Sequence, residues 1–476
     1  MKRLLQLLSL AVLILLAVLL YHTLTLPQAD SRVAELPDLT QAVDEDAMVE
    51  RLAMALRFPT LPDQPDAFVG FHGFLRDRFP LTHQTLSVKP FGHSLLYHWD
   101  SQNDCPPQLL LAHQDVVPVS SPEKWQHPPF AGVVDDDFVW GRGALDDKGS
   151  LMAILEATEA LLQNGQTPAC AVYLAFGHDE EIGGREGAVK IAAWLEQQGL
   201  RFGLILDEGG MMLPGSTLGL DRPVALMGIA EKGYMTVELQ AEAEPGHSSR
   251  PPERTAIGDL AAAIDHLQTH PRPASLSGPT RKMLEQVASH QPFAKRLVFA
   301  NLWLFEPLII RQLEGKPETN ALLRTTMAPT LLSAGVKENV LPATASATLN
   351  FRLAPGETRD SLRAYLEKAL PDSISVTSRG AFLSDPSPVT GIPSATFDRL
   401  AALARALPEQ PVVAPYLLIA GTDARHYQSL SDQVFRFMPV SLGQDDLARF
   451  HGHNERLPRE QYPHMVRFYA GLMLGR

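Results

Sequence analysis

Between residues 108 and 210, short apolar segments alternate with longer stretches of helical spacing, and this alternation constrains the fold more than any other feature. The apolar segments are QLLLAH, CAVYLAFG and LILD. The segments between them, GSLMAILEATEALLQNG and GAVKIAAWLEQQG, carry apolar residues three and four positions apart. Apolar strands joined by helices are typical of βαβ units, in which helices cover both faces of a mainly parallel sheet. We therefore predict an α/β fold.

Ionisable residues follow these apolar segments. His113 and Asp115 come after the first segment, Asp207 ends the third, and four consecutive ionisable residues, from His178 to Glu181, follow the second. The carboxyl ends of parallel strands form the edge where open α/β sheets bind ligands. Each group alone has a plain alternative, because polar residues at a strand end also face solvent. Together the groups favour a site at that edge.

Two further segments add candidates. Asp146 and Asp147 stand at the start of a predicted helix in WGRGALDDKGSL, and His451 lies in ARFHGHNERLP near the C-terminus. Two acids at a helix N-terminus can also act only as caps that complement the helix dipole. The glycines do not make a dinucleotide fingerprint, because Asp146 stands where the third glycine belongs.

The donor types in these groups point to a metal. Imidazoles and carboxylates without cysteine fit Zn²⁺, with Co²⁺ or Mn²⁺ as possible substitutes on ligand type. The chain has only two cysteines, Cys105 and Cys170, which excludes a cysteine-rich metal site or a disulfide scaffold. We expect two neighbouring ions that share one carboxylate and activate a water for attack on a carbonyl.

The motifs AHQDVVPV, WGRGALDDKG, GHDEEIGG, LDEGG, PGHSSRPP, NVLP and HGHNERL occur in this order. In order and spacing they resemble the co-catalytic zinc peptidase family that contains aminoacylase, carnosinase, glutamate carboxypeptidase and carboxypeptidase S. The resemblance covers the chain from about residue 46 to the C-terminus. The tryptophan-bearing stretch before Asp146 and the string GTDARHY are most similar to the carboxypeptidase S branch, which includes secreted enzymes that act on N-acyl amino acids.

The resemblance implies roles for the strand-end residues. Glu180 would be the general base, and Asp115 would orient the ring of a ligand histidine. Asp146 would bridge both zinc ions, with its peptide bond to Asp147 held cis. The full set of implied metal ligands is His113, Asp146, Glu181, Asp207 and His451.

The resemblance also implies substrate-binding residues. His247, in PGHSSRPP, would stabilise the oxyanion. Asn339 and Arg352 would hold the substrate carboxylate, and an Arg guanidinium suits a carboxylate because it forms paired charged hydrogen bonds. The backbone at Gly421 would contact the same carboxylate. Without the resemblance, His247 and Arg352 read as ordinary surface residues.

The N-terminal segment is a candidate membrane anchor. Lys2 and Arg3 precede an apolar run over residues 4–21, which as a helix would span about 27 Å, close to the thickness of a bilayer core. A run this long, with no small-residue cleavage site after it, favours an uncleaved anchor over a signal peptide. The basic residues would stay in the cytoplasm, so the rest of the chain would lie on the periplasmic or extracellular side, or be secreted if the segment is cleaved. In such a compartment a disulfide between Cys105 and Cys170 is an alternative, but Cys170 opens an apolar strand and is read more readily as a buried thiol.

Segment patterns divide the rest of the chain. We expect an anchor or signal over 1–22, a linker over 23–45, and a catalytic domain made of 46–227 and 382–476. The inserted residues 228–381 read as strand, helix, strand, strand, helix, strand, which is the order of a split βαβ (ferredoxin-like) α+β domain, here a lid. Some members of the family pair through this domain, so a homodimer is possible.

The combined hypothesis is a dizinc hydrolase that cleaves the amide next to the C-terminal residue of a small peptide or N-acyl amino acid. An aminopeptidase, or an N-acyl amino acid deacylase or synthase, remains open because metal ligands do not select which end of a substrate binds. An inactive, metal-free scaffold is the alternative of another class. The formal net charge of -13 argues against a nucleic-acid partner.

Overall fold

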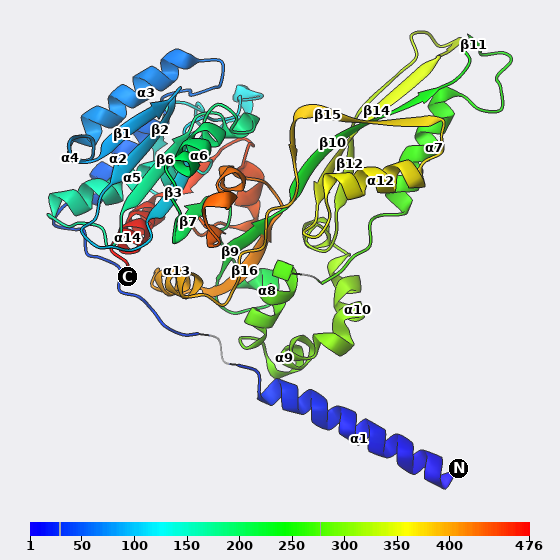
Figure 1. Ribbon diagram of the computed structural model, residues 1–476, viewed down its shortest axis with the longest axis horizontal. Helices are drawn as coiled ribbons and strands as arrows, with labels where there is room; N and C mark the ends of the chain where they lie inside the picture. Colours follow the sequence, from blue (N-terminus) through cyan, green and yellow to red (C-terminus); the bar gives the residue numbers. More distant parts are fainter. Residues whose placement is uncertain (28–29, 277) are drawn as a thin grey trace.

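The computed structural model describes residues 1–27, 30–276 and 278–476, and consists of three visibly different parts: a long N-terminal helix, a large α/β body and an extended lid (Figure 1). Residues 28 and 29, which fall in the predicted linker over 23–45, lie outside the described residues.

The body is built on a nine-stranded sheet in the order β1-β2-β6-β3-β7-β17-β9-β16, with β8 paired to β9. Strand β3 runs parallel to β6 and β7, β17 is parallel to β7, and β16 is parallel to β9. The pairs β1–β2, β2–β6, β17–β9 and β8–β9 are antiparallel. The predicted, mainly parallel α/β sheet is therefore confirmed. Its strands are β1 (Ser87–Phe91), β2 (Ser94–Trp99), β3 (Gln108–His113), β6 (Val172–Gly177), β7 (Leu204–Asp207), β8 (Met212–Leu213), β9 (Val224–Glu231), β16 (Val412–Leu418) and β17 (Val434–Arg436).

The central strands are apolar throughout because both faces of the sheet are covered. Alternate residues of β3 belong to two separate cores: Leu110 packs into the core that includes α5 and α14, and Leu109 into the core that includes α6. Since successive side chains of a strand point to opposite faces, a strand between two helical layers has no polar face. The helices of the body are α2 (Glu45–Ala55), α3 (Pro65–Arg78), α4 (Pro80–Thr85), α5 (Lys148–Gln163), α6 (Ala188–Gln197), α13 (Ala395–Arg405) and α14 (Tyr462–Met473).

Short elements complete the body. A three-stranded sheet joins the loop before α5 to the segment before α14, and it consists of β4 (Val133–Val134), β5 (Phe138–Trp140) and β18 (Arg456–Pro458). The single-turn 3₁₀ helices are η1 (Pro122–Lys124), η2 (Glu180–Ile182), η3 (Gly215–Leu218), η4 (Asp423–His426), η5 (Gln428–Leu430), η6 (Gln444–Arg449) and η7 (Arg459–Gln461).

The lid is an antiparallel sheet in the order β12-β14-β10-β15, with α7 and α12 packed on one face. Strands β10 and β14 alternate between buried and partly exposed residues, as a sheet covered on one side requires. This arrangement confirms the predicted split βαβ topology. The lid elements are β10 (Gly233–Glu242), β11 (Gly246–His247), α7 (Ala256–Thr269), β12 (Thr326–Ala334), β13 (Val340–Leu341), β14 (Thr344–Leu353), α12 (Arg359–Ala369) and β15 (Ile374–Ser384).

A helical segment between α7 and β12 was not anticipated. It contains α8 (Gly278–Ala288), α9 (Phe293–Ala300), α10 (Leu302–Leu313) and α11 (Pro317–Asn320). Although this segment falls within the inserted span 228–381, α8 packs on β16 of the body, and their apolar residues share one core. We therefore propose that 278–320 belong with the catalytic domain and that the lid proper begins at Gly233 and ends at Ser384.

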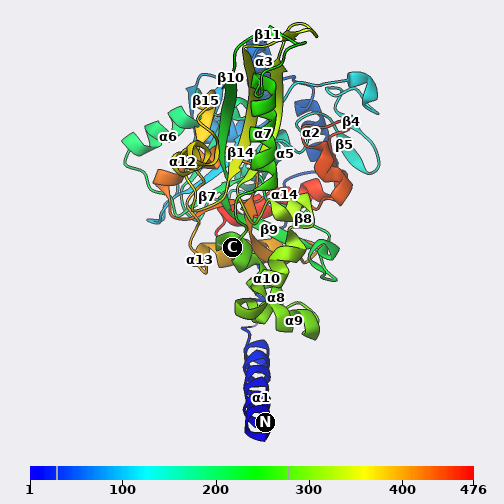
Figure 2. The ribbon, with the colours of Figure 1, turned by 90° about the vertical axis from the view of Figure 1, so that its right-hand side faces the viewer.

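The N-terminal helix α1 (Lys2–Leu24) leaves the body beside α9, and its outer turns project away from the protein in both views (Figures 1 and 2). Among the described residues it is the helix that is long and apolar enough to cross a membrane. A signal sequence has a similar length and composition.

The expectation of a buried free thiol at Cys170 is wrong, because Cys170 forms a disulfide with Cys105. The two residues are 65 positions apart in the sequence, but they precede β3 and β6, which are adjacent in the sheet. Sheet neighbours that far apart along the chain bring the two sulfurs together. A disulfide of this kind is typical of oxidising compartments.

Candidate metal centre

A cavity of about 810 Å³ lies between the body and the lid, at the carboxyl ends of β6, β7 and β16. One wall carries the acidic residues of the body, and the opposite wall carries residues of the lid. The polar lining residues are Asp146, Glu180, Glu181, Glu208, Lys232, Glu318, Arg352, Ser384, Thr422, Arg425 and His451. The position agrees with the rule that open α/β sheets bind ligands at their carboxyl edge.

Asp146 lies between two histidines from distant parts of the chain. His113 Nε2, at the end of β3, is 2.8 Å from Asp146 Oδ1, and His451 Nε2 is 3.0 Å from Asp146 Oδ2. His451 Nε2 also lies 3.1 Å from Glu181 Oε2. The structure therefore brings together four of the five predicted ligands, with one carboxylate between the two imidazoles. The peptide bond from Asp146 to Asp147 is cis.

The imidazoles and carboxylates perturb one another strongly. Hydrogen bonds that the His451 ring donates to the carboxylates of Asp146 and then Glu181 raise the pKa of His451 to about 10. Burial alone would raise the pKa of Asp146, but hydrogen bonds from His113 and His451 hold that pKa below its usual range. Burial and the neighbouring Asp146 raise the pKa of Glu181. The cluster therefore holds more negative charge than the two imidazoles and the surrounding protein neutralise.

Asp115 lies against the histidine ring that it is expected to orient, mainly through its backbone oxygen. Nδ1 of His113 lies 2.9 Å from the backbone oxygen of Asp115 and 3.4 Å from its carboxylate. This contact aims Nε2 of the ring at the cavity. The Asp115 carboxylate accepts hydrogen bonds from the backbone N–H groups of Glu180 and Glu181. One buried residue therefore orients both the first histidine and the turn that carries the two glutamates.

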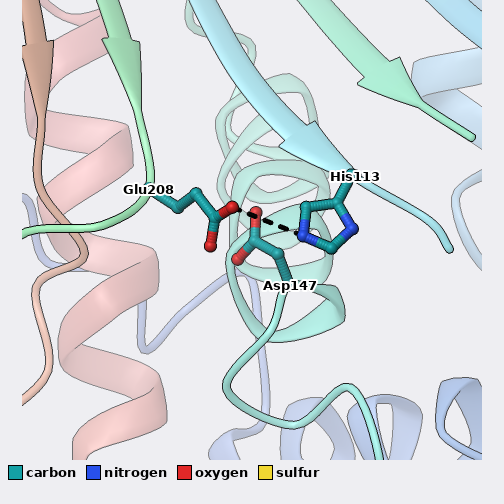
Figure 3. Close-up of side chains that lie close together, drawn as sticks. All are labelled: His113, Asp147 and Glu208. Atoms are coloured by element: carbon teal, nitrogen blue, oxygen red, sulfur yellow. Dashed lines mark ion pairs between the residues drawn. The ribbon is translucent and has the colours of Figure 1, made fainter. Parts of the chain in front are cut away.

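Asp207 does not join the cluster. Its carboxylate accepts hydrogen bonds from the backbone N–H of Ala424 at 2.7 Å and of Glu208 at 3.0 Å. Glu208 instead lines the cavity, and its Oε1 lies 3.4 Å from His113 Nε2 (Figure 3). Side chains of adjacent residues in an extended chain point to opposite sides, so only one of Asp207 and Glu208 can face the cavity.

Asp147 is a second residue that sequence reasoning left unused. One ligand atom from each of His113, Asp147 and Glu208 lies within 4.8 Å of the others (Figure 3). His113, Asp146 and Glu181 form a second group of the same kind. Both oxygens of the buried Asp147 carboxylate lack a hydrogen-bond partner among the described residues, and so does Oε1 of Glu181. Buried carboxylate oxygens without partners are costly, and divalent cations satisfy them. With oxygen and imidazole donors only, this set fits divalent cations.

An ion pair holds the two ligand loops together. Arg142 donates to Oε2 of Glu455 at 2.6 Å, and its other nitrogen donates to the backbone oxygens of His451 and Gly452. Oε1 of Glu455 accepts from the backbone N–H groups of Leu145 and Asp146. His451 adopts a φ of 57°, which non-glycine residues rarely do. Arg142 lies in the sequence GRG and Glu455 in the sequence NER, but nothing in their spacing indicated that the two residues form an ion pair.

Glu180, the predicted base, lines the cavity beside Arg425, whose guanidinium lies 3.4 Å from its Oε1. Burial, followed by the repulsion of Asp423, raises the pKa of Glu180 well above the usual value. A carboxylate with a raised pKa accepts a proton more readily near neutral pH.

Of the four predicted substrate-binding residues, Arg352 and Gly421 line the cavity. Arg352 reaches it from β14 of the lid, with its guanidinium 4.6 Å from the centre of the Tyr234 ring. Lys232, which the sequence reasoning missed, stands near it and donates to the backbone oxygens of Ala321 and Arg324. Burial and the charge of Arg352 lower the pKa of Lys232 to about 7.

His247 and Asn339 lie elsewhere. They belong to the small β11–β13 ribbon at the far tip of the lid, where both are exposed (Figure 1). The backbone oxygen of Asn339 accepts from Ser248, and His247 Nδ1 accepts from the backbone N–H of Ser249. The structure brings these two residues to each other, but not to the cavity of the same chain.

Comparison with known proteins gives one consistent result. Residues 109–475 match Peptidase family M20/M25/M40. The chain is 41% identical to probable carboxypeptidase S-like 2 of Dictyostelium discoideum, over 90% of this chain and 84% of the relative. It is 38% identical to the N-fatty-acyl-amino acid synthase/hydrolase PM20D1 of Xenopus tropicalis, over 97% and 92%. The fold is similar to that of the M20 family metallo-carboxypeptidase Sso-CP2 from Sulfolobus solfataricus, with a TM-score of 0.67 at 19% identity, covering 91% of this chain and 99% of the other.

Proposed function

The chain belongs to Peptidase family M20/M25/M40 and is a metallohydrolase of that family, and from this premise we propose that it cleaves the amide bond beside a free carboxylate, in N-acyl amino acids or small peptides. The observation that carries the proposal is the lining of the cavity, which has the acidic residues of the metal-binding wall on the body and the guanidinium of Arg352 on the lid. Such a pair of walls suits an amide at one side and a carboxylate at the other.

The chain's own residues suit two divalent ions, zinc in the first instance. We assign Asp146 to both ions, His113 with Glu208 to one, and Glu181 with His451 to the other, so Glu208 takes the role first expected of Asp207. When bound, such ions polarise a carbonyl and lower the pKa of a coordinated water. Glu180 is placed to accept a proton from the attacking water and to return it to the nitrogen of the leaving amine.

The remaining lining of the cavity favours an apolar group on the other side of the amide. The apolar lining residues are Ile182, Met211, Leu213, Leu226, Tyr234, Phe382, Tyr416, Leu418, Ile419, Leu447 and Phe450. Burying methylene groups against such a surface stabilises binding by about 0.8 kcal/mol each. This lining favours N-acyl amino acids with a long apolar acyl chain over dipeptides with polar side chains, in line with the activity for which the Xenopus relative is named.

Arg352 separates this proposal from an aminopeptidase on the same site. For Arg352→Ala, we expect kcat/KM to fall by about 10²-fold or more on N-acyl amino acids, because a charged hydrogen-bonded pair is lost. The same variant should change little on substrates whose carboxylate is amidated. Arg352→Lys should recover part of the loss. Equal losses on free and amidated substrates would overturn the choice of the carboxylate end, and activity that survives a chelator would overturn the metallohydrolase itself.

We also propose that a second copy of the chain supplies His247. His247 and Asn339 stand at the tip of an extended lid, away from their own cavity. The edge strand β12 of that lid exposes Leu331 and Leu332, which suit pairing with another lid. In a two-fold dimer each tip would reach the partner's cavity, where an imidazole stabilises the oxyanion.

For localisation, we propose that α1 stays as a membrane anchor with the body outside the cytoplasm. Its length, its basic N-terminus and the disulfide between Cys105 and Cys170 support this proposal.

A further inference from the structure

An apolar surface next to α1 has no role in the metal centre or in the lid. It consists of Phe293 on α9 and of Trp303, Leu304 and Leu308 on α10, and we call it the apolar shelf. Trp303 is 54% exposed, Leu308 60% and Phe293 53%. A cluster of large apolar side chains left in water is unfavourable, and such clusters usually mark an interaction site.

The shelf follows from the sequence of α10. Trp303, Leu304 and Leu308 lie within one side of the helix by its period of 3.6 residues, and that side faces outward. Leu302 and Ile309, on the opposite side, pack into the core shared with α8 and β16. Apart from Arg311 and Gln312, the exposed side of this helix is therefore apolar like its buried side, which is unusual for a helix that faces only water.

The position of the shelf indicates what covers it. The last turn of α1 packs on the junction between α9 and α10, where Leu19 and Thr23 are buried. The side-chain amide of Asn301 donates to the backbone oxygen of Leu19 at 3.1 Å, and the ring of His22 lies 6.5 Å from that of Trp303. Both views show α9 and α10 at the end of the protein from which α1 projects (Figures 1 and 2).

We propose that the apolar shelf inserts into the interfacial layer of the membrane that α1 crosses. If the apolar run of α1 occupies the hydrocarbon layer, the turn that contacts Asn301 lies at its surface, and the shelf is carried to the same depth. Trp and Leu side chains on a helix beside a membrane span are suited to that layer. The body is then attached at two places, the anchor and the shelf, and its orientation relative to the lipid is fixed.

Site-directed spin labelling tests this inference on the full chain in nanodiscs of phosphatidylcholine. Both natural cysteines are in the disulfide, so an introduced cysteine is the one that reacts with the label. Three variants are needed: Leu308→Cys on the shelf, Val69→Cys on α3 as an equally exposed control at 59%, and Leu13→Cys in the middle of α1. Each labelled variant should retain activity on an N-acyl amino acid.

The label at 308 should be several-fold less accessible to an aqueous nickel chelate than the label at 69, and more accessible to oxygen, because oxygen concentrates in lipid. Equal nickel accessibility at 308 and 69 would overturn the inference. Protection of 308 from both reagents would also overturn it, since the shelf would then be covered by protein. The inference rests on α1 spanning the bilayer, and nickel access at position 13 would show separately that the anchor, not the shelf, has failed.

Discussion

The rim of the cavity and the tip of the lid both carry histidines that the sequence assigned to one active site, and the two regions are built in opposite ways. At the rim, His113 and His451 lie against Asp146, in a setting fixed by Asp115 and by the Arg142–Glu455 pair. At the tip, His247 is exposed, and its imidazole accepts a hydrogen bond from the backbone N–H of Ser249. The residues at the rim are held together within one chain, whereas the residues of the tip lie away from the cavity of that chain.

The largest effect should come from the base at the rim. Glu180→Gln keeps the size of the side chain but removes the proton acceptor, so kcat should fall by about 10²–10⁴-fold. The metal content, measured by mass spectrometry of the purified protein, should not change, because Glu180 is not assigned as a ligand. The matched control is Glu186→Gln, an exposed glutamate paired with Lys190, which should retain full activity. A variant at 180 with near-normal kcat would break the assignment of the rim.

A smaller effect should distinguish the roles of Asp207 and Glu208 at the end of β7. Glu208→Ala removes a proposed ligand, so the protein should keep about one ion per chain instead of two under the same dialysis. Asp207→Ala removes only hydrogen bonds to the backbone of Glu208 and Ala424, so two ions should remain, bound about 10–100-fold more weakly. Loss of one ion from the Asp207 variant, together with full occupancy in the Glu208 variant, would return the role to Asp207.

The smallest expected effect is the recovery of activity in an experiment that tests the role of His247 at the tip of the lid. His247→Ala and Glu180→Gln should each be nearly inactive alone. If the tip serves the partner's cavity, an equal mixture that exchanges subunits should recover about one quarter of the wild-type rate, because half of the dimers are mixed and each has one complete site. A mixture as inactive as its parents would contradict the contribution in trans, while a chain that stays monomeric and active would remove the need for a second copy.

The sheet and the lid topology were predictable because their signals are local. Apolar runs such as LLLAH and the alternation of GYMTVELQAE depend only on which faces of a strand are covered. The metal cluster followed from the same reasoning, since the carboxyl ends of parallel strands meet at one edge.

The structure differs from the sequence-based predictions where local structure depends on contacts between segments that are far apart in the sequence. Asp207 and Glu208 are equally good ligands by residue type, and contacts with distant residues, such as the hydrogen bond from the backbone N–H of Ala424, hold Asp207 out of the cluster. Cys105 and Cys170 pair because β3 and β6 are adjacent, a fact about strand order that no local pattern contains. The helices α8 to α11 have ordinary amphipathic sequences, so their packing on β16 was not visible in advance.

The joint between body and lid has a mechanical consequence. The chain passes from β9 into β10 at Lys232 and returns after Ser384, and a Cβ added at Gly233 would approach the backbone oxygen of Ser384 to 2.6 Å. Because 278–320 pack with the body, the chain crosses twice more, between α7 and α8 and between α11 and β12. Four segments therefore join the lid to the body, with Arg352 next to the start of β10 and of β12, and the β11–β13 ribbon lies at the far end of the lid. Any rotation of the lid about these joints would move Arg352 less than the β11–β13 ribbon, because the ribbon lies farther from them.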